Sequence, residues 1–295
     1  MKITKRAELT SNQLITIIIL IISFAIILAF FFILNLHSTI DKETCRNSVI
    51  TRGALPMGKD AVQLKCKTQD VCLSMGGDCN VQRKDMVTVK VSDESELTKE
   101  MVNLLWDCWW MMGEGKVDYM SSGMGFDETY CSICNKIYFD SKIKEKYKDG
   151  ITYSLIYRYM QSTKIPDKDE TYLFSIYKVN SLDSVRNGLL EGKNPVDIYA
   201  YKIDPSKEYV SVTAMIKTTS NWEIAGTTIG GLIGTVVGFS VPGSHWVTVP
   251  AGISIGSSVG MWLGPADIKY MVPKYLEFNG KELEALNCKE YVSEG

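Results

Sequence analysis

One uninterrupted apolar run near the N-terminus constrains this chain more strongly than any other feature of its sequence. No charged residue occurs between Leu9 and Ile40, and 17 of the 21 residues from Leu14 to Leu34 are Leu, Ile or Phe. As a helix, this run rises about 31 Å, which matches the thickness of the hydrocarbon core of a bilayer. Its large apolar side chains together favour insertion by about 5 to 10 kcal/mol. The run therefore predicts a single transmembrane helix over residues 13–36.

The charges that flank this run predict its orientation. Lys2, Lys5 and Arg6 precede it, whereas the acidic and basic residues that follow it cancel one another. Because positive charge is retained on the cytoplasmic side, residues 1–12 are predicted to form a cytoplasmic tail and the bulk of the chain to lie outside the cell. The run is longer than the apolar region of a signal peptide and lacks a good cleavage site, so we expect an uncleaved anchor in the cell membrane.

The residues before the run allow a second interpretation. The segment from Lys5 to Thr10, Lys-Arg-Ala-Glu-Leu-Thr, followed by a long apolar helix, resembles the leader of type IV pilin-like proteins. In that family a peptidase cuts after a basic residue and a small one, and the apolar helix packs into the core of a filament. The usual glycine before the cut is Ala7 in this chain. The resemblance implies a mature chain that begins at Glu8 and serves as a structural subunit of a surface filament.

All cysteines of the chain follow the apolar run. Their even number, on the predicted outer side of the membrane, indicates disulfide bonds, although the sequence does not choose among the pairings. A structural zinc site would need two close pairs, and the CxxC spacing occurs only at Cys131 and Cys134. That spacing leaves open a redox site if a helix follows over residues 135–148. We expect Cys288 to pair with one of the other seven, which are Cys45, Cys66, Cys72, Cys79, Cys108, Cys131 and Cys134.

Residues 41–219 are predicted to form an α+β ectodomain, which residues 267–295 rejoin. Residues 86–91 alternate like a half-buried strand, and Asp93 with Glu96 forms a capping box that opens a helix ending at Gly113. The tryptophans of that helix lie on more than one face, so we expect a partner or a membrane surface to cover its second face. Further strands are expected at 171–179, 197–203, 209–217 and 267–278, and further helices at 153–161, 181–190 and 280–288. No regular βαβ period is present, which favours α+β over a doubly wound sheet.

Glycines recur every four residues in an uncharged stretch within residues 220–266. On a helix, such a strip of small residues lets two backbones approach closely, as helices do in lipid. The stretch therefore predicts a glycine-laddered helical hairpin, and it resembles the glycine-zipper hairpins of membrane-associated proteins. The hairpin either inserts into a membrane or is buried in the ectodomain or between subunits. Its ladder residues are Gly226, Gly230, Gly234, Gly238, Gly252, Gly256, Gly260 and Gly264, and Trp222, Trp246 and Trp262 mark its ends.

The sequence offers no convincing catalytic constellation. Residues 252–256 match the Gly-x-Ser-x-Gly nucleophile pattern, but no histidine follows Ser254 to act as its base. A net charge of −2 argues against nucleic-acid binding. We therefore expect a non-enzymatic surface protein without cofactor or metal, whose hairpin perturbs a membrane, forms a pore or assembles a surface complex. Its expected partners are the lipid bilayer and either other copies of itself or another membrane or surface protein. The alternatives are a pilin-like filament subunit and a membrane-tethered thiol oxidoreductase that uses Cys131 and Cys134.

Overall fold

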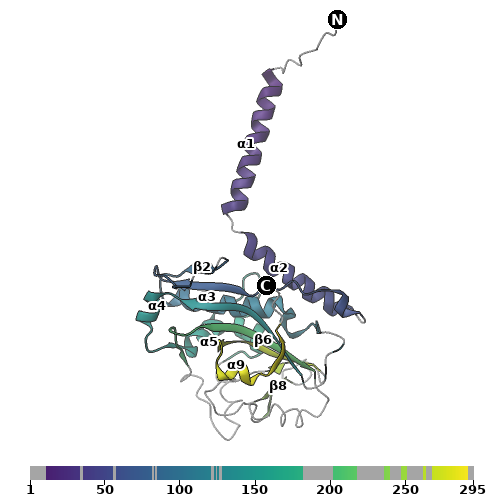
Figure 1. Ribbon diagram of the computed structural model, residues 1–295, viewed down its shortest axis with the longest axis vertical. Coiled ribbons are helices and arrows are strands. Elements are labelled where there is room, and N and C mark those ends of the chain that lie inside the picture. The colour runs from purple at the N-terminus through teal and green to yellow at the C-terminus, as the bar shows by residue number, and fades with distance from the viewer. Residues whose placement is uncertain are drawn as a thin grey trace. The chain divides into compact units, whose positions relative to one another are not determined.

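The computed structural model divides the chain into two compact units, Met1–Glu43 and Thr44–Gly295 (Figure 1). The residues that it describes are 11–33, 36–55, 58–81, 83, 85–120, 123, 125, 128–181, 202–217, 236–239, 247–250, 262–263 and 268–291. The leader residues before 11, including the expected cleavage position between Ala7 and Glu8, lie outside this range.

The apolar run forms helix α1 (Ser11–Ile33), as its composition predicts. Over the described residues, however, no helix combines the length and the hydropathy that a membrane crossing requires. The predicted transmembrane anchor over residues 13–36 is therefore wrong, and so is the predicted single-pass location in the cell membrane with a cytoplasmic tail at 1–12.

The second unit is built around a mixed sheet with the strand order β2-β1-β3-β6-β10-β9. Strands β2 and β3 flank β1 in parallel, whereas β6 runs antiparallel to β3 and to β10. A further strand, β11, pairs in parallel with the first residues of β3. The bounds are β1 Gln69–Ser74, β2 Val87–Lys90, β3 Thr129–Phe139, β6 Tyr209–Lys217, β9 Trp262–Leu263, β10 Ile268–Glu277 and β11 Cys288–Tyr291.

Successive side chains of β6 are buried in two different cores, which shows that the sheet is covered on both faces. Tyr209 and Met215 pack into the larger core on one side, whereas Val210, Val212 and Ile216 pack into a smaller core on the other. All of these side chains are buried, as a central strand with two covered faces requires. Helix α9 (Lys281–Ala285), yellow in Figure 1, closes the smaller core with Leu283.

Helix α3 (Glu94–Met111) forms the centre of the larger core. Asp93 caps its start by accepting a hydrogen bond from the Glu96 amide at 2.9 Å, and the Glu96 carboxylate accepts one from the Ser92 amide at 2.7 Å, which confirms the predicted cap. Helix α3 packs on β6 and β10, and helices α5 (Tyr153–Ser162) and α6 (Tyr172–Tyr177) pack on α3. Trp106 meets Tyr172 of α6 edge to face, with ring centroids 6.0 Å apart. The second face of α3 is thus covered by the chain itself.

The second unit also contains several short helices and strands outside the main sheet. Helix α2 (Leu36–Ala54) leads into the second unit, and β4 pairs antiparallel with β5. The other bounds are η1 Lys59–Ala61, η2 Gly113–Gly115, α4 Ser141–Lys146, β4 Ile151–Thr152 and β5 Lys202–Ile203. The predicted α+β class is confirmed for the second unit, as are the strands at 209–217 and 267–278 and the helix at 153–161.

Two predicted elements differ from the structure. Within the predicted strand 171–179, residues 172–177 form helix α6. Thr171 caps the helix by accepting a hydrogen bond from the Phe174 amide at 3.2 Å, and Lys178 ends it with a left-handed backbone. Residues 135–139 continue β3, and a short helix begins only at Ser141. The predicted helix at 181–190 lies outside the described residues except for Ser181, which is not helical.

The glycine-laddered segment is also not helical where it is described. Strands β7 (Val236–Phe239) and β8 (Val247–Pro250) pair antiparallel, with Gly238 opposite Thr248. Trp262 lies in β9, opposite Met271 of β10. The predicted helical hairpin is therefore wrong at these positions, because runs of β-branched residues favour a strand. The other ladder and end residues lie outside the described part of the chain: Gly226, Gly230, Gly234, Gly252, Gly256, Gly260, Gly264, Trp222 and Trp246.

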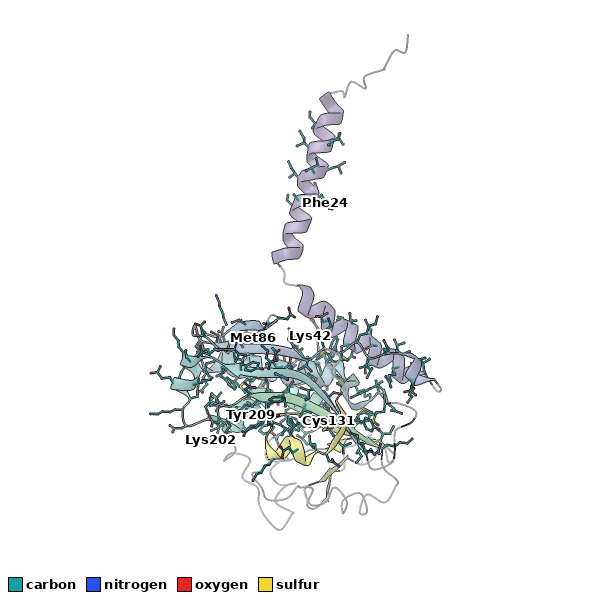
Figure 2. All side chains as sticks on the ribbon, viewed as in Figure 1. Phe24, Lys42, Met86, Cys131, Lys202 and Tyr209 are labelled. Atoms are coloured by element: carbon teal, nitrogen blue, oxygen red, sulfur yellow. A yellow bond between two sulfur atoms is a disulfide. The ribbon has the colours of Figure 1, made fainter. Side chains whose placement is uncertain are left out.

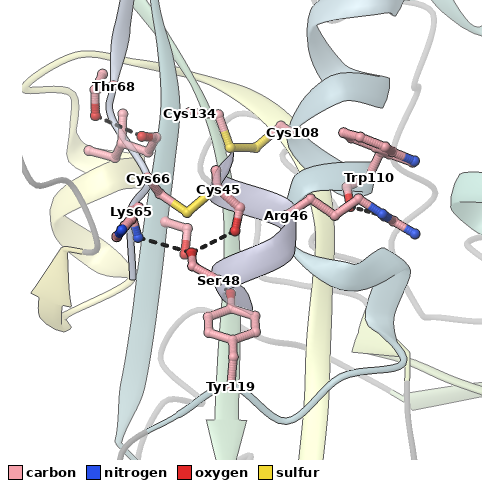
Figure 3. The surroundings of a disulfide bond; sticks show 12 residues. Cys45, Arg46, Ser48, Lys65, Cys66, Thr68, Cys108, Trp110, Tyr119 and Cys134 are labelled. Atoms are coloured by element: carbon pink, nitrogen blue, oxygen red, sulfur yellow. Dashed lines mark hydrogen bonds between the residues drawn. A yellow bond between two sulfur atoms is a disulfide. The ribbon is translucent and has the colours of Figure 1, made fainter. Parts of the chain in front are cut away.

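All eight cysteines form disulfides, which confirms the predicted framework. Cys131 bonds to Cys288, so the expected pairing of Cys288 with an upstream cysteine is confirmed. Figure 3 shows Cys45–Cys66 joining α2 to the segment before β1, close to the bond between Cys108 of α3 and Cys134 of β3. The fourth bond, Cys72–Cys79, closes the loop after β1.

Candidate functional site

The predicted redox pair is split between two disulfides. Cys131 packs into the smaller core and Cys134 into the larger one, because residues three apart on a strand point to opposite faces of a sheet. Each sulfur therefore bonds to a partner on its own face, Cys288 or Cys108. Both cysteines are buried, and neither precedes a helix directly. No observation here favours the thiol oxidoreductase.

Helix α1 carries the largest exposed apolar surface of the described residues. Nine large apolar side chains on it are between 45% and 64% exposed. Because they occupy consecutive and alternating positions, they point in every direction around the helix axis. Figure 2 shows one of them, Phe24, projecting from the helix. The nine are Ile15, Ile17, Ile18, Ile19, Leu20, Ile21, Ile22, Phe24 and Ile26.

A charged cluster forms where α3 ends, around the turn Gly113-Glu114-Gly115. All three residues adopt left-handed backbone angles, with φ of 79°, 57° and 67°. Glycine suits this conformation at both ends of the turn, whereas Glu114 adopts it at a cost of about 1 kcal/mol. The turn brings the Glu114 side chain into a buried position directly beside the last residues of α3.

Three cations from different elements surround the Glu114 carboxylate. Arg46 of α2 donates from Nη2 to Oε1 at 3.2 Å, and Nζ of Lys116 lies 3.1 Å from Oε2. Lys168, in the loop between α5 and α6, places its Nζ 3.5 Å from the same Oε2. Burial alone would raise the pKa of Glu114, but the hydrogen bond from Lys116 and the nearby positive charges outweigh it and lower that pKa. The carboxylate is therefore ionised at neutral pH.

Aromatic rings hold two of these cations in place. The Arg46 guanidinium lies 4.3 Å above the Trp110 ring centroid and also donates from Nη1 to the Trp110 carbonyl, as Figure 3 shows. The Lys168 ammonium lies 4.7 Å from the centroid of Trp106. A cation over an indole face is stabilised by the ring quadrupole, so both positive charges are fixed in position.

Lys178 adds a fourth positive charge to the cluster. Its backbone is left-handed, with a φ of 58°, and its side chain is half-buried, with Nζ 5.7 Å from the Phe174 ring centroid. Burial lowers the pKa of Lys178, and the charges of Lys116 and Lys168 lower it further. The carboxylates of Glu170 and Glu114 act in the opposite direction but do not cancel this effect. Three cations thus pair with the one carboxylate of Glu114, and Lys178 adds positive charge nearby.

The cluster cannot be recognised from the sequence, because its residues come from four separate segments. The one local signal was an acidic residue between two glycines at the end of a helix. Chemically, the cluster can bind an anion. Among the described residues, no group of three or more His, Cys, Asp or Glu side chains is arranged to hold a metal ion.

The turn itself gives a testable prediction. Gly115→Ala is expected to lower the free energy of unfolding by about 1–3 kcal/mol, because the new Cβ would lie 2.7 Å from the Trp109 ring at a φ of 67°. Gly58→Ala is the matched control, since Gly58 has a φ of 73° but no neighbour within 4 Å. Urea denaturation of both variants measures the difference. Equal losses would show that backbone strain alone matters and that the contact with Trp109 does not.

No protein-family model, curated protein or solved structure matches this chain.

Proposed function

We propose that the chain is a non-enzymatic structural subunit that associates with other copies of itself through helix α1. The single observation that carries this proposal is the exposure of large apolar side chains around the whole circumference of α1. A helix that is apolar on every face is stable only where other apolar groups surround it. Each neighbouring copy of α1 carries the same apolar side chains and can therefore provide this apolar environment.

The energetics favour association. Covering a large aliphatic side chain fully contributes about 1.5–3 kcal/mol. Nine side chains that are each roughly half exposed therefore gain on the order of 10 kcal/mol when neighbouring helices cover them. Bringing subunits together costs a comparable amount, about 4–15 kcal/mol. A pair of helices alone is thus marginal, whereas a bundle or filament that covers every face of α1 is favourable.

The part of α2 that belongs to the second unit is anchored by several contacts. Cys45 and Val49 on α2 are buried, and the Cys45–Cys66 disulfide ties α2 to the segment before β1. The Ser48 hydroxyl donates to the Cys45 carbonyl at 2.7 Å and accepts from the Lys65 amide at 2.9 Å. The part of α2 from Cys45 onward is therefore firmly held, and disulfides of this kind form in an oxidising environment.

The resemblance to pilin-like leaders supports the same function. In that family the apolar helix is the element that packs into the filament core, which is the role proposed here for α1. N-terminal sequencing of the mature chain tests this part separately. A start at Glu8 would support a filament subunit, whereas an intact start at Met1 would contradict pilin-like processing but not self-association.

Substitution on α1 tests the association. The triple variant Ile18→Ser, Leu20→Ser and Ile22→Ser removes apolar groups that are 46%, 64% and 53% exposed, with Ile18 and Ile22 on one face of the helix and Leu20 on the opposite face. In detergent-free sedimentation velocity, the wild type is expected to form large assemblies at micromolar concentration and the variant to shift to the mass of one chain. Ile50→Ser on α2, where the side chain is 39% exposed, is the control and should leave the assemblies intact. A monomeric wild type would overturn the proposal.

A further inference from the structure

We propose that the basic cluster formed by Arg46, Lys116, Lys168 and Lys178 around Glu114 is a binding site for a doubly charged oxyanion, a sulfate or phosphate group. This site is independent of the association through α1. It lies in the second unit, and none of its residues belongs to the exposed apolar surface.

The charges of the cluster match such a ligand. Arg46, Lys116 and Lys168 all pair with the single carboxylate of Glu114, at 3.2, 3.1 and 3.5 Å, so positive charge exceeds negative charge around this carboxylate. The two oxygens of Glu114 already accept contacts from Arg46, Lys116 and Lys168 and cannot neutralise a further cation equally well. A dianion placed between the ammonium groups would restore neutrality.

Lys178 is the residue that most needs an added anion. Within the described part of the chain, no carboxylate forms an ion pair with its ammonium group. Its side chain nevertheless remains half-buried, beside the like charges of Lys116 and Lys168. A left-handed lysine backbone adds a cost of about 1 kcal/mol. An anion would offset both costs, because a buried charge is stable only when it is paired.

The site can be reached from solvent, and it is held in place before a ligand binds. The Lys116 side chain is 65% exposed and that of Lys168 is 33% exposed, so their ammonium groups can meet an incoming ligand. Trp106 and Trp110 fix the positions of Lys168 and Arg46. Ammonium and guanidinium groups form their strongest hydrogen bonds with anionic oxygens, and a tetrahedral oxyanion accepts several of them at once.

Calorimetric titration of the full chain with sodium sulfate and with sodium phosphate, in low-salt buffer free of both ions, tests the site. Lys116→Ala and Lys178→Gly are each expected to weaken binding about tenfold. Glycine suits the left-handed backbone at position 178, and Lys116 is largely exposed, so both variants are expected to fold, and a melting curve of each variant checks this. Lys142→Ala on α4, an exposed lysine outside the cluster, is the control and should bind like the wild type.

Glu114→Gln separates an anion site from a purely structural ion cluster. Removing this carboxylate increases the positive charge of the site, so sulfate is expected to bind several-fold more tightly to the variant. If the ion cluster serves only to stabilise the fold, Glu114→Gln should not bind sulfate more tightly than the wild type. A sulfated disaccharide, titrated in parallel, distinguishes a free ion from an ester group as the preferred ligand. The proposal is overturned if neither ion nor the disaccharide binds, or if affinity is the same in all of these variants.

Discussion

Replacing both Cys131 and Cys288 by alanine is expected to lower the free energy of unfolding by about 5 kcal/mol, the largest loss among the four disulfides. This bond joins residues 157 positions apart, and the entropy that a crosslink removes from the unfolded chain grows with the length of the loop it closes. It also holds β11 beside the first residues of β3. Cys131 lies in the smaller core, so alanine keeps that position apolar.

The Cys72–Cys79 bond provides the matched comparison. It closes a separation of only seven residues, so the Cys72→Ala, Cys79→Ala variant is expected to lose about 2 kcal/mol. Urea denaturation of both double variants under non-reducing conditions, with the wild type alongside, measures the two losses. Equal losses would contradict the dependence on loop length. Non-reducing peptide mapping should recover Cys288 linked to Cys131, and a free thiol at Cys288 would contradict the pairing itself.

The elements that the sequence predicted correctly are those specified by neighbouring residues. Helix α3 was recognised because its cap residues and its buried positions all lie within one short segment. Strand β6 was predicted over Tyr209–Lys217, the bounds that it has in the structure, because its β-branched and apolar residues are contiguous. In both cases, local preference and tertiary packing favour the same structure.

The wrong predictions arise where one pattern fits two structures. Glycines four residues apart line one face of a helix, but four is also a multiple of the strand period, so they line one face of a strand as well. Gly238 in β7 follows the second alternative. Similarly, the apolar and aromatic residues of α6 are compatible with a strand as well as with a helix, and the sequence does not show that they pack against α3. The CxxC spacing suggested a redox pair only because the sequence does not show that Cys131 and Cys134 face opposite sides of a strand.

The candidate site was missed for a different reason. Arg46, Glu114, Lys168 and Lys178 are distant in sequence and meet only after α2, α3 and α6 have packed together. No spacing rule connects such residues. The role proposed for α1, in contrast, rests on composition: the sequence shows an apolar helix but not what covers it.

Asp140 is expected to contribute more to stability than any other single carboxylate of the described residues. It follows β3, is fully buried, and accepts hydrogen bonds from the amides of Ile143 at 2.7 Å and Gly77 at 2.6 Å and from the Ser74 hydroxyl at 2.9 Å. These bonds start α4 and hold the loop that Cys72–Cys79 closes. Asp140→Ala leaves the donors buried without an acceptor, so the expected loss is about 3–5 kcal/mol.

The pH dependence of this contribution follows from the pKa of Asp140. Burial would raise that pKa, but the hydrogen bonds from Ile143, Gly77 and Ser74 outweigh burial and lower it. A carboxyl group with a lowered pKa in the folded state stabilises the protein fully above its unfolded pKa of about 3.9 and loses this effect as pH falls toward the folded value. The stability difference between the wild type and Asp140→Asn should therefore be constant from neutral pH down to about 5 and shrink below about 4.

Asp169 is the control for this experiment, because its pKa is also lowered, by the hydrogen bond and the charge of Lys164. Its side chain is 98% exposed, however, so solvent screens the ion pair with Lys164 despite their 2.6 Å separation. Asp169→Asn should consequently leave the urea midpoint unchanged at every pH. If Asp140→Asn behaved in the same way, the buried hydrogen bonds of Asp140 would contribute nothing to stability, and the loop after β1 would have to be held by its disulfide alone.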